Sequence, residues 1–190
     1  MPCEADAARA RHRVFYALWP SDGVRAALEA SVRELAQHAQ ARWVRAENFH
    51  ITLRFLGSVS PAQLEYLCHQ REPDAASFTL QLNQLRYRRR RQLLWMEPSV
   101  VPSAWGELEA SLRAALDRGS ANPEALAPIP HVTLGRKVCL TVPFPPATPT
   151  IIWPVESVVL VESTLRPSGS EYCVLRRWRL QSTPAGGSMK

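Results

Sequence analysis

Two short segments of the sequence share one pattern, in which a histidine, an apolar residue, a threonine and a leucine follow one another. The segments are His50-Ile51-Thr52-Leu53 and His131-Val132-Thr133-Leu134, and their histidines stand 131 − 50 = 81 positions apart. With five histidines and eight threonines in the chain, chance placement gives roughly 0.05 such segments. The repetition therefore indicates a shared chemical role.

Paired histidines and hydroxyls suit acid–base chemistry on an anionic substrate. Residues i and i+2 of a strand share a face, so each motif projects an imidazole and a hydroxyl together. An imidazole has an ordinary pKa of about 6.5, so one histidine can accept a proton while the other donates one. If the two strands lie side by side, His50 and His131 are the candidate catalytic residues, and Thr52 and Thr133 can hold an anion between them.

Two simpler explanations of the motifs are plain strand residues and a metal site. Plain strand residues do not explain the duplication. Strand histidines can ligate zinc, but no third Cys, Asp, Glu or His stands at a suitable spacing, so we expect no metal and no cofactor. The four cysteines lie far apart without a C-x-x-C pair, so we expect reduced thiols.

The first half of the chain predicts a strand, helix, strand, helix order. Residues 13–19 are rich in β-branched and aromatic residues and end at a proline, which is typical of a buried strand. Apolar residues at helical spacing predict a helix over 24–40, capped by Ser21 or Asp22. Residues 49–56 alternate strictly, which predicts a strand with His50, Thr52 and Arg54 on one face and Ile51, Leu53 and Phe55 on the other. Ser60, Pro61 and Gln63 then open a short helix with a capping box.

The second half repeats this order loosely. Residues 78–82 and 92–96 are predicted strands, joined across the basic run Arg86–Arg91, and residues 105–116 form a predicted helix. Eight prolines fall within 123–154, which predicts a loop with one short strand that holds His131. Residues 157–162 and 172–180 are the last predicted strands.

Length and composition limit the class of protein. The chain has 190 residues, 46% of them hydrophobic, with a formal charge of +6. We expect one domain over residues 1–182 and a polar tail over 183–190. Apolar runs are too short to span a membrane, and the acidic first residues do not fit a secretory signal, so a cytoplasmic protein is expected. The positive charge favours anionic partners.

Both motifs and their surroundings resemble the 2H phosphoesterase superfamily. Within it, the flanks Glu-Asn-Phe-His and Arg-Phe-Leu-Gly resemble the RNA 2′,3′-cyclic phosphodiesterases, also called 2′-5′ RNA ligases. The resemblance extends over residues 13–180, in the segments 13–18, 43–57, 93–95, 130–136, 160–163 and 172–175.

The resemblance implies a fold and an activity. The fold is α+β and bilobal, with two pseudo-symmetric antiparallel sheets lining a central cleft and helices on their outer faces. The activity is metal-free hydrolysis of RNA 2′,3′-cyclic phosphate ends to 2′-phosphomonoesters, with reversible 2′-5′ ligation in some members. The partners are RNA 3′ ends or cyclic nucleotides, and a monomer is expected because one chain completes the cleft.

The resemblance also implies roles for further residues. Thr52, Thr133 and Arg136 would bind the phosphate, although Arg136 needs a bulge near Gly135 to face the cleft. The resemblance makes Phe15 or Tyr16 a candidate stacking partner for a base.

Two groups of arginines are candidates from the sequence pattern itself. Arg54 is predicted on the strand face of His50, where it can bind phosphate or be solvated at the strand end. The run Arg86–Arg91 can bind RNA phosphates or form a solvated charged loop.

Two other functions remain open on the sequence. One is a 2H phosphoesterase for a small cyclic nucleotide or a 2′-5′ oligonucleotide, because the motif residues would contact only the phosphate and the edge of the sugar. The other is a non-catalytic RNA-binding module, which would not need two titratable histidines.

Overall fold

The computed structural model describes residues 11–117, 129–141, 149–167 and 169–182. In chain order its elements are β1 (His12–Leu18), α2 (Asp22–Leu35), β2 (Ala39–Trp43), η1 (Ala46–Asn48), β3 (Ile51–Val59), α3 (Pro61–Cys68), β4 (Phe78–Arg88), η2 (Arg89–Arg91), β5 (Leu93–Pro98), α4 (Ser103–Asp117), β6 (Val132–Leu140), β7 (Ile151–Val155), β8 (Ser157–Arg166) and β9 (Gly169–Arg179).

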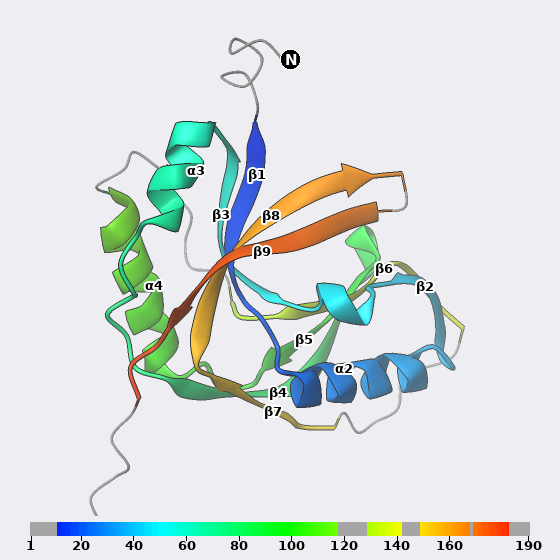
Figure 1. Ribbon diagram of the computed structural model, residues 1–190. Coiled ribbons are helices and arrows are strands. Elements are labelled where there is room, and N and C mark those ends of the chain that lie inside the picture. Colours follow the sequence, from blue (N-terminus) through cyan, green and yellow to red (C-terminus); the bar gives the residue numbers. More distant parts are fainter. Residues whose placement is uncertain (1–10, 118–128, 142–148, 168, 183–190) are drawn as a thin grey trace, which may run out of the picture.

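The strands form one curled antiparallel sheet in the order β7-β4-β5-β6-β3-β1-β8-β9, with β2 paired to β6 (Figure 1). The two motif strands, β3 and β6, meet at the centre and are joined through the pair Ile51 and Val132. Each is the residue between histidine and threonine in its motif, so a pseudo-twofold axis passes between them. The predicted α+β class and pseudo-symmetry are confirmed, and the two predicted sheets are the two halves of this sheet.

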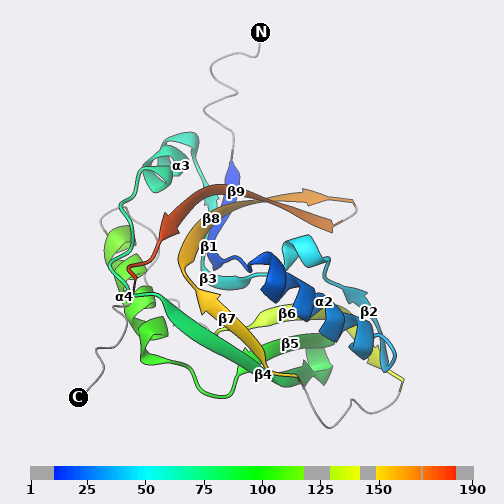
Figure 2. The ribbon, with the colours of Figure 1, turned by 60° about the horizontal axis from the view of Figure 1, so that its bottom comes forward.

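The helices pack beside the two halves of the sheet (Figures 1 and 2). Helix α2 contacts β7, whereas α3 and α4 lie together near the half that contains β1, β8 and β9. Large apolar side chains, such as Phe49, Leu108 and Trp153, are fully buried between sheet and helices. Their burial provides most of the driving force that holds β3 and β6 together. None of the described helices combines the length and apolar character required to span a bilayer.

The predicted helix starts are confirmed. The Ser21 hydroxyl accepts a hydrogen bond from the N–H of Val24 at 3.4 Å. Ser60 and Gln63 form the predicted capping box, in which each side chain accepts the backbone N–H of the other, at 3.3 and 2.9 Å. These caps satisfy N–H groups that a helix start leaves unpaired.

Two predicted elements are wrong. The helix predicted over 24–40 ends at Leu35, and Ala39–Trp43 form strand β2. Ala39 is buried in this strand. Its apolar character fits a buried position in a helix equally well, so it did not distinguish the two elements. Strand β7 lies inside the predicted loop and contains Pro154. Strand β7 is the outermost strand of the order, so one of its edges has no neighbouring strand. A proline, which has no backbone N–H to donate, is tolerated in such an edge strand. The predicted tail 183–190 lies outside the described residues.

Candidate active site

A cavity of about 830 Å³ lies where the two halves of the sheet meet. It contains both motif histidines and both motif threonines, together with the predicted residues Arg136 and Phe15. The complete lining is Arg13, Phe15, Arg42, Trp43, Val44, Arg45, Asn48, His50, Thr52, Phe55, Leu93, His131, Thr133, Arg136, Ser163, Leu165, Gly169, Ser170 and Tyr172.

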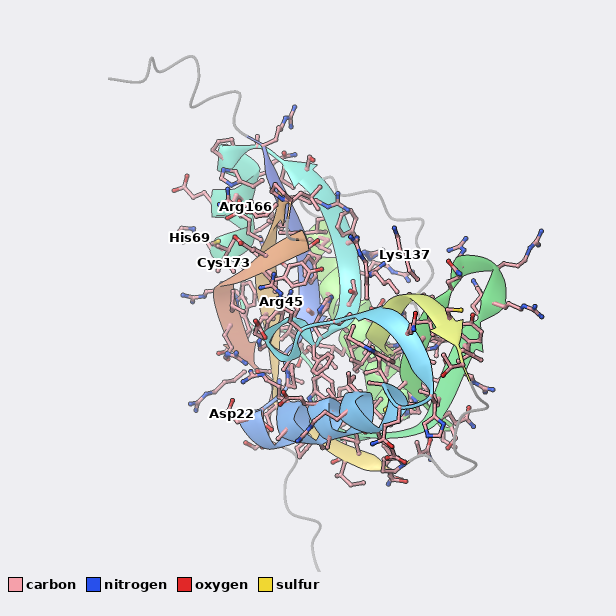
Figure 3. All side chains as sticks on the ribbon, turned by 90° about the vertical axis from the view of Figure 1, so that its right-hand side faces the viewer. Asp22, Arg45, His69, Lys137, Arg166 and Cys173 are labelled. Atoms are coloured by element: carbon pink, nitrogen blue, oxygen red, sulfur yellow. The ribbon has the colours of Figure 1, made fainter. Side chains whose placement is uncertain are left out.

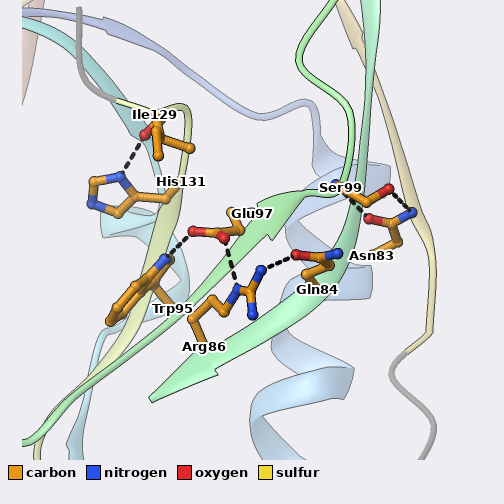
Figure 4. A network of polar contacts seen from close by, with 8 residues as sticks. All are labelled: Asn83, Gln84, Arg86, Trp95, Glu97, Ser99, Ile129 and His131. Atoms are coloured by element: carbon orange, nitrogen blue, oxygen red, sulfur yellow. Dashed lines mark hydrogen bonds and ion pairs between the residues drawn. The ribbon is translucent and has the colours of Figure 1, made fainter. Parts of the chain in front are cut away.

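The two imidazoles are held in the same way. Nδ1 of His50 donates to the carbonyl oxygen of Asn48 at 2.7 Å, and Nδ1 of His131 donates to that of Ile129 at 2.8 Å (Figure 4). Each partner stands two residues before its histidine. Because a carbonyl oxygen can only accept, the proton of each neutral ring lies on Nδ1. Nε2 is therefore the atom of each ring that can take up or release a proton.

The side chain of Asn48 ties the first motif to a distant hairpin. Its amide nitrogen donates to the carbonyl oxygen of Ser170, in β9, at 3.0 Å. Ser170 also lines the cavity. The β8–β9 hairpin therefore forms one wall of the cavity and helps to hold the carbonyl group that orients His50.

A bulge in β3 changes the predicted alternation. Thr52 pairs with Ala17 and Arg54 pairs with Tyr16, so Leu53 is the extra residue. Beyond the bulge Arg54 is buried, at 8% exposure, and its charge lowers the pKa of Glu109 of α4. Phe55, in contrast, lines the cavity and is 53% exposed. The prediction that Arg54 shares a face with His50, with Phe55 on the opposite face, is wrong. The extra residue of the bulge reverses the face of the sheet on which each later residue of the strand lies.

Strand β6 contains the same bulge at the equivalent position. Thr133 pairs with Trp95 and Gly135 pairs with Leu94, so Leu134 is the extra residue. The bulge turns Arg136 toward the cavity, as its predicted phosphate contact requires. Arg136 and Phe55 each stand five residues after a motif histidine, so the pseudo-symmetry places a guanidinium in one half and an aromatic ring in the other.

Gly135 leaves room for an indole. A Cβ atom there would lie 3.1 Å from Cε3 of Trp43 and 3.3 Å from Cγ2 of Val138. We expect Gly135→Val to lower the free energy of unfolding by about 1–3 kcal/mol, because an added side chain overpacks this contact. Urea unfolding measures the change. Gly106→Val is the control for substitution of glycine, because a Cβ at Gly106 meets nothing within 4 Å; an equal loss from both variants would contradict the contact as the cause.

His50 lies in an aromatic cage. Its ring centroid lies 5.1 Å from those of Phe15 and Tyr172 and 5.8 Å from that of Trp19, whose ring is stacked at an interplanar angle of 14°. Burial is the largest cause that lowers the pKa of His50, and the charges of Arg136 and His131 lower it further, while the hydrogen bond to Asn48 opposes them. The lowered pKa favours the neutral form of His50.

The cage bears on the two aromatic residues predicted to stack on a base. Phe15 is 3% exposed and packs edge-to-face on Tyr172 as well as beside His50, so its ring is already enclosed. Tyr16 points to the opposite face of the sheet, beside Trp178, and does not line the cavity. Sequence reasoning missed Trp19 and Tyr172. Trp19 stands four residues after Phe15 on the same side of the chain, a spacing that could have revealed it.

A polar network stands behind His131 (Figure 4). The ring of Trp95 meets that of His131 edge-on, with centroids 6.1 Å apart. The Trp95 indole N–H donates to Glu97 at 2.6 Å, and Glu97 also accepts from Nε of Arg86 at 2.8 Å. Arg86 is thus the one member of the predicted basic run that supports a residue beside the cavity. Arg88 is the last residue of β4, and Arg89–Arg91 form the exposed turn between β4 and β5.

The cavity wall is cationic. Arg13, Arg42, Arg45 and Arg136 line it, and none of its described lining residues is an aspartate or glutamate. Figure 3 shows Arg45 beside the turn before β3 and Arg166 on the β8–β9 hairpin. The described residues contain no group of three side chains able to hold a metal ion. Such a wall attracts an anion, and the histidine pair can move protons on it.

Comparison with known proteins agrees with this geometry. The family described as LigT like Phosphoesterase matches residues 18–95. The crystal structure of Escherichia coli LigT without ligand superposes with a TM-score of 0.73 at 28% identity, over 90% of this chain and 98% of that one. In sequence and in fold, the chain is similar to the LigT-like phosphoesterases.

The curated relatives that the chain matches carry one name. The RNA 2′,3′-cyclic phosphodiesterase of Thermus thermophilus is 29% identical over 187 residues, which cover 89% of this chain and 90% of the relative. The protein of that name from Escherichia coli is 29% identical over 165 residues, covering 80% and 92%. Escherichia coli LigT has also been solved with 3′-AMP and with phosphate. The predicted resemblance is confirmed.

Proposed function

We propose that this protein is a LigT-like phosphoesterase that hydrolyses RNA 2′,3′-cyclic phosphate ends to 2′-phosphomonoesters, with His50 and His131 as the acid–base pair. One observation carries the proposal: two imidazoles with matching Nδ1 hydrogen bonds line the same cationic cavity. The relatives named RNA 2′,3′-cyclic phosphodiesterase support the substrate. The 3′-AMP and phosphate complexes of the Escherichia coli protein support a nucleotide in this cavity.

The reaction needs one proton removed and one supplied. One imidazole takes a proton from water through Nε2, and the water oxygen forms a bond to phosphorus. The bond between phosphorus and O3′ breaks, and the other histidine, as imidazolium, gives its proton to O3′. The products are a 3′-hydroxyl and a 2′-phosphomonoester, with no covalent enzyme intermediate. Thr52, Thr133 and Arg136 donate hydrogen bonds to the non-bridging oxygens, where charge increases in the transition state.

The surroundings of the two histidines suggest which is the base. A base must be neutral when water arrives, and burial in the aromatic cage lowers the pKa of His50. We therefore assign the base role to His50 and the acid role to His131. Phe15, Trp19 and Tyr172 act as positioning residues that keep the His50 ring oriented and partly dry.

The assignment predicts a pH dependence. Protonation of His50 abolishes its base function, and its pKa is lowered, so we expect kcat/KM to fall on the acidic side with a midpoint below the ordinary histidine value of about 6.5. His131→Ala should keep this acidic limb and lose the basic one. Profiles of kcat/KM between pH 4.5 and 9 measure both, and an acidic limb that persists in His50→Ala would contradict the assignment.

Hydrolysis of a short RNA with a 2′,3′-cyclic phosphate end, in EDTA, tests the function. We expect a 2′-phosphomonoester, identified by phosphorus NMR, at the same rate after added Mg²⁺ or Zn²⁺. Turnover of nucleoside cyclic phosphates or 2′-5′ oligonucleotides without turnover of RNA would favour the alternative 2H substrate. RNA binding without turnover of any of them would favour the binding module. A single domain, a monomeric state, a cytoplasmic location and independence from metal are part of the proposal and stay predictions.

A further inference from the structure

Two arginines stand directly opposite each other on the cavity wall. Arg42 of β2 and Arg136 of β6 are cross-strand partners. Both side chains are exposed, and both line the cavity. Side chains at opposite positions of an antiparallel pair have Cβ atoms about 5 Å apart, and like charges there destabilise the pairing.

No carboxylate of the described residues offsets this repulsion. Elsewhere in the described chain, Arg25, Arg86 and Arg166 each pair with an aspartate or glutamate. Arg42 and Arg136 have no such ion pair with a described residue. A bound anion is the simplest group that makes two adjacent guanidiniums favourable, because each offers forked donors to phosphate oxygens.

The positions of the two arginines relative to the histidines differ. Arg136 lines the cavity together with His50, and its charge lowers the pKa of His50, so the proposed mechanism places Arg136 at the reacting phosphate. Arg42 is one strand farther out, on β2 at the side of β6 away from β5. Because Arg42 lines the cavity from a strand that carries neither histidine motif, it can contact a phosphate group other than the one at the histidines.

We propose that Arg42 binds a second phosphate of the substrate, the one attached to O5′ of the terminal nucleotide. The inference rests on the proposed function and defines its substrate class. In an RNA this phosphate links the terminal nucleotide to the rest of the chain. The preferred substrate is therefore an RNA end or a 5′-phosphorylated nucleotide, and a nucleoside 2′,3′-cyclic phosphate lacks the group that Arg42 recognises.

Arg13 and Arg45 are the other cavity arginines that could bind this phosphate, and Arg13 is the one on the opposite side of the cavity from Arg42.

The surroundings of Arg13 differ from those of Arg42. The guanidinium carbon of Arg13 lies 4.8 Å above the ring of Phe55, a cation–π contact that already engages it. It belongs to β1, in the half opposite Arg42. A 5′-phosphate bound by Arg13 would lie beside Phe55, on the side of the cavity formed by β1. Substitution of Arg13 and substitution of Arg42 therefore distinguish the two positions.

Calorimetric binding of two nucleotides tests the proposal without turnover. Adenosine 2′-monophosphate and adenosine 2′,5′-bisphosphate differ only by the 5′-phosphate. We expect the wild type to bind the bisphosphate about tenfold more tightly. Arg42→Gln should reduce this preference below about twofold and leave the affinity for the monophosphate unchanged, and Arg42→Lys should keep part of it. Arg33→Gln, on the exposed face of α2, is the control for the lost charge.

Several results would overturn the proposal. The wild type could bind both nucleotides equally tightly, or bind neither. The preference for the bisphosphate could also stay unchanged in Arg42→Gln, or be lost in Arg13→Gln or Arg45→Gln instead. Hydrolysis of a nucleoside 2′,3′-cyclic phosphate, which has no 5′-phosphate, tests the proposed function separately. A protein that hydrolyses it but shows no preference for the bisphosphate keeps its proposed function and loses the Arg42 site.

Discussion

Replacing His50 or His131 with alanine is expected to lower kcat/KM for a 2′,3′-cyclic phosphate by about 10³-fold. Each variant removes one of the two groups that move a proton through Nε2, and a positioned acid or base contributes about 10²–10⁴-fold. Because the two groups act in one step, the double variant should lose little more than either single variant. Initial rates over a range of substrate concentrations measure the loss.

A third histidine supplies the control for these variants. His69 follows α3, is exposed, and bonds through Nδ1 to the carbonyl oxygen of Glu65 at 2.8 Å. His69→Ala should therefore keep the wild-type kcat/KM. Circular dichroism and thermal unfolding check that all variants are folded. Folded His50→Ala or His131→Ala with more than a tenth of the wild-type kcat/KM would contradict the paired mechanism.

Replacing Arg136 with alanine is expected to lower kcat by about 10²-fold. In the proposed mechanism the guanidinium stabilises charge that grows on the phosphate oxygens as water attacks, and loss of one such donor costs about this much. Its charge also lowers the pKa of His50. The acidic limb of the pH profile in Arg136→Ala should therefore move upward, toward the ordinary histidine value, which a loss of folding alone would not cause.

Matched substitutions separate this role from a general charge effect. Arg136→Lys keeps the charge but loses the forked donors, so we expect an intermediate kcat and an acidic limb close to that of the wild type. Arg88→Ala removes an exposed arginine at the end of β4, outside the cavity, and should change neither quantity. An Arg136→Ala variant with wild-type kcat would exclude the phosphate contact.

The central part of the molecule could be predicted because its periodicity and its chemistry coincide. His50, Thr52, His131 and Thr133 combine strand alternation with a duplicated motif, and all four line the cavity. The capping box at Ser60 is a local pattern with a local cause, so it too was visible in the sequence. Non-local pairing was harder to predict. Strand β7 depends on its edge position, which the proline-rich sequence around it does not reveal.

The bulges mark the limit of the alternation argument. Strict alternation places Arg54 in the cleft and Arg136 outside it, and the structure has the reverse arrangement. The bulges at Leu53 and Leu134 arise from the register of the neighbouring strands, β1 and β5, and both leucines remain buried. Gly135 was the local sign of an irregular strand in the second half. The first half has no such sign, because Arg54 stands at the equivalent position.

The cage around His50 shows a second limit. Trp19 follows from the spacing along β1, but Tyr172 comes from a hairpin more than 100 residues away and carries no motif. Its place depends on the pairing of β8 with β1, which only the assembled sheet defines. The lowered pKa of His50, and with it the proposed division of roles between the histidines, therefore depends on tertiary structure that the sequence pattern does not specify.

The stereochemical course at phosphorus tests the central claim most directly. One isomer of a nucleoside 2′,3′-cyclic phosphorothioate is hydrolysed by the wild type in ¹⁸O-labelled water with EDTA, and the configuration of the 2′-phosphorothioate product is determined. A single attack by water in line with O3′, assisted by the two histidines, predicts inversion at phosphorus. Retention would mean that an enzyme group first forms a covalent bond to phosphorus, and it would contradict the acid–base account of His50 and His131.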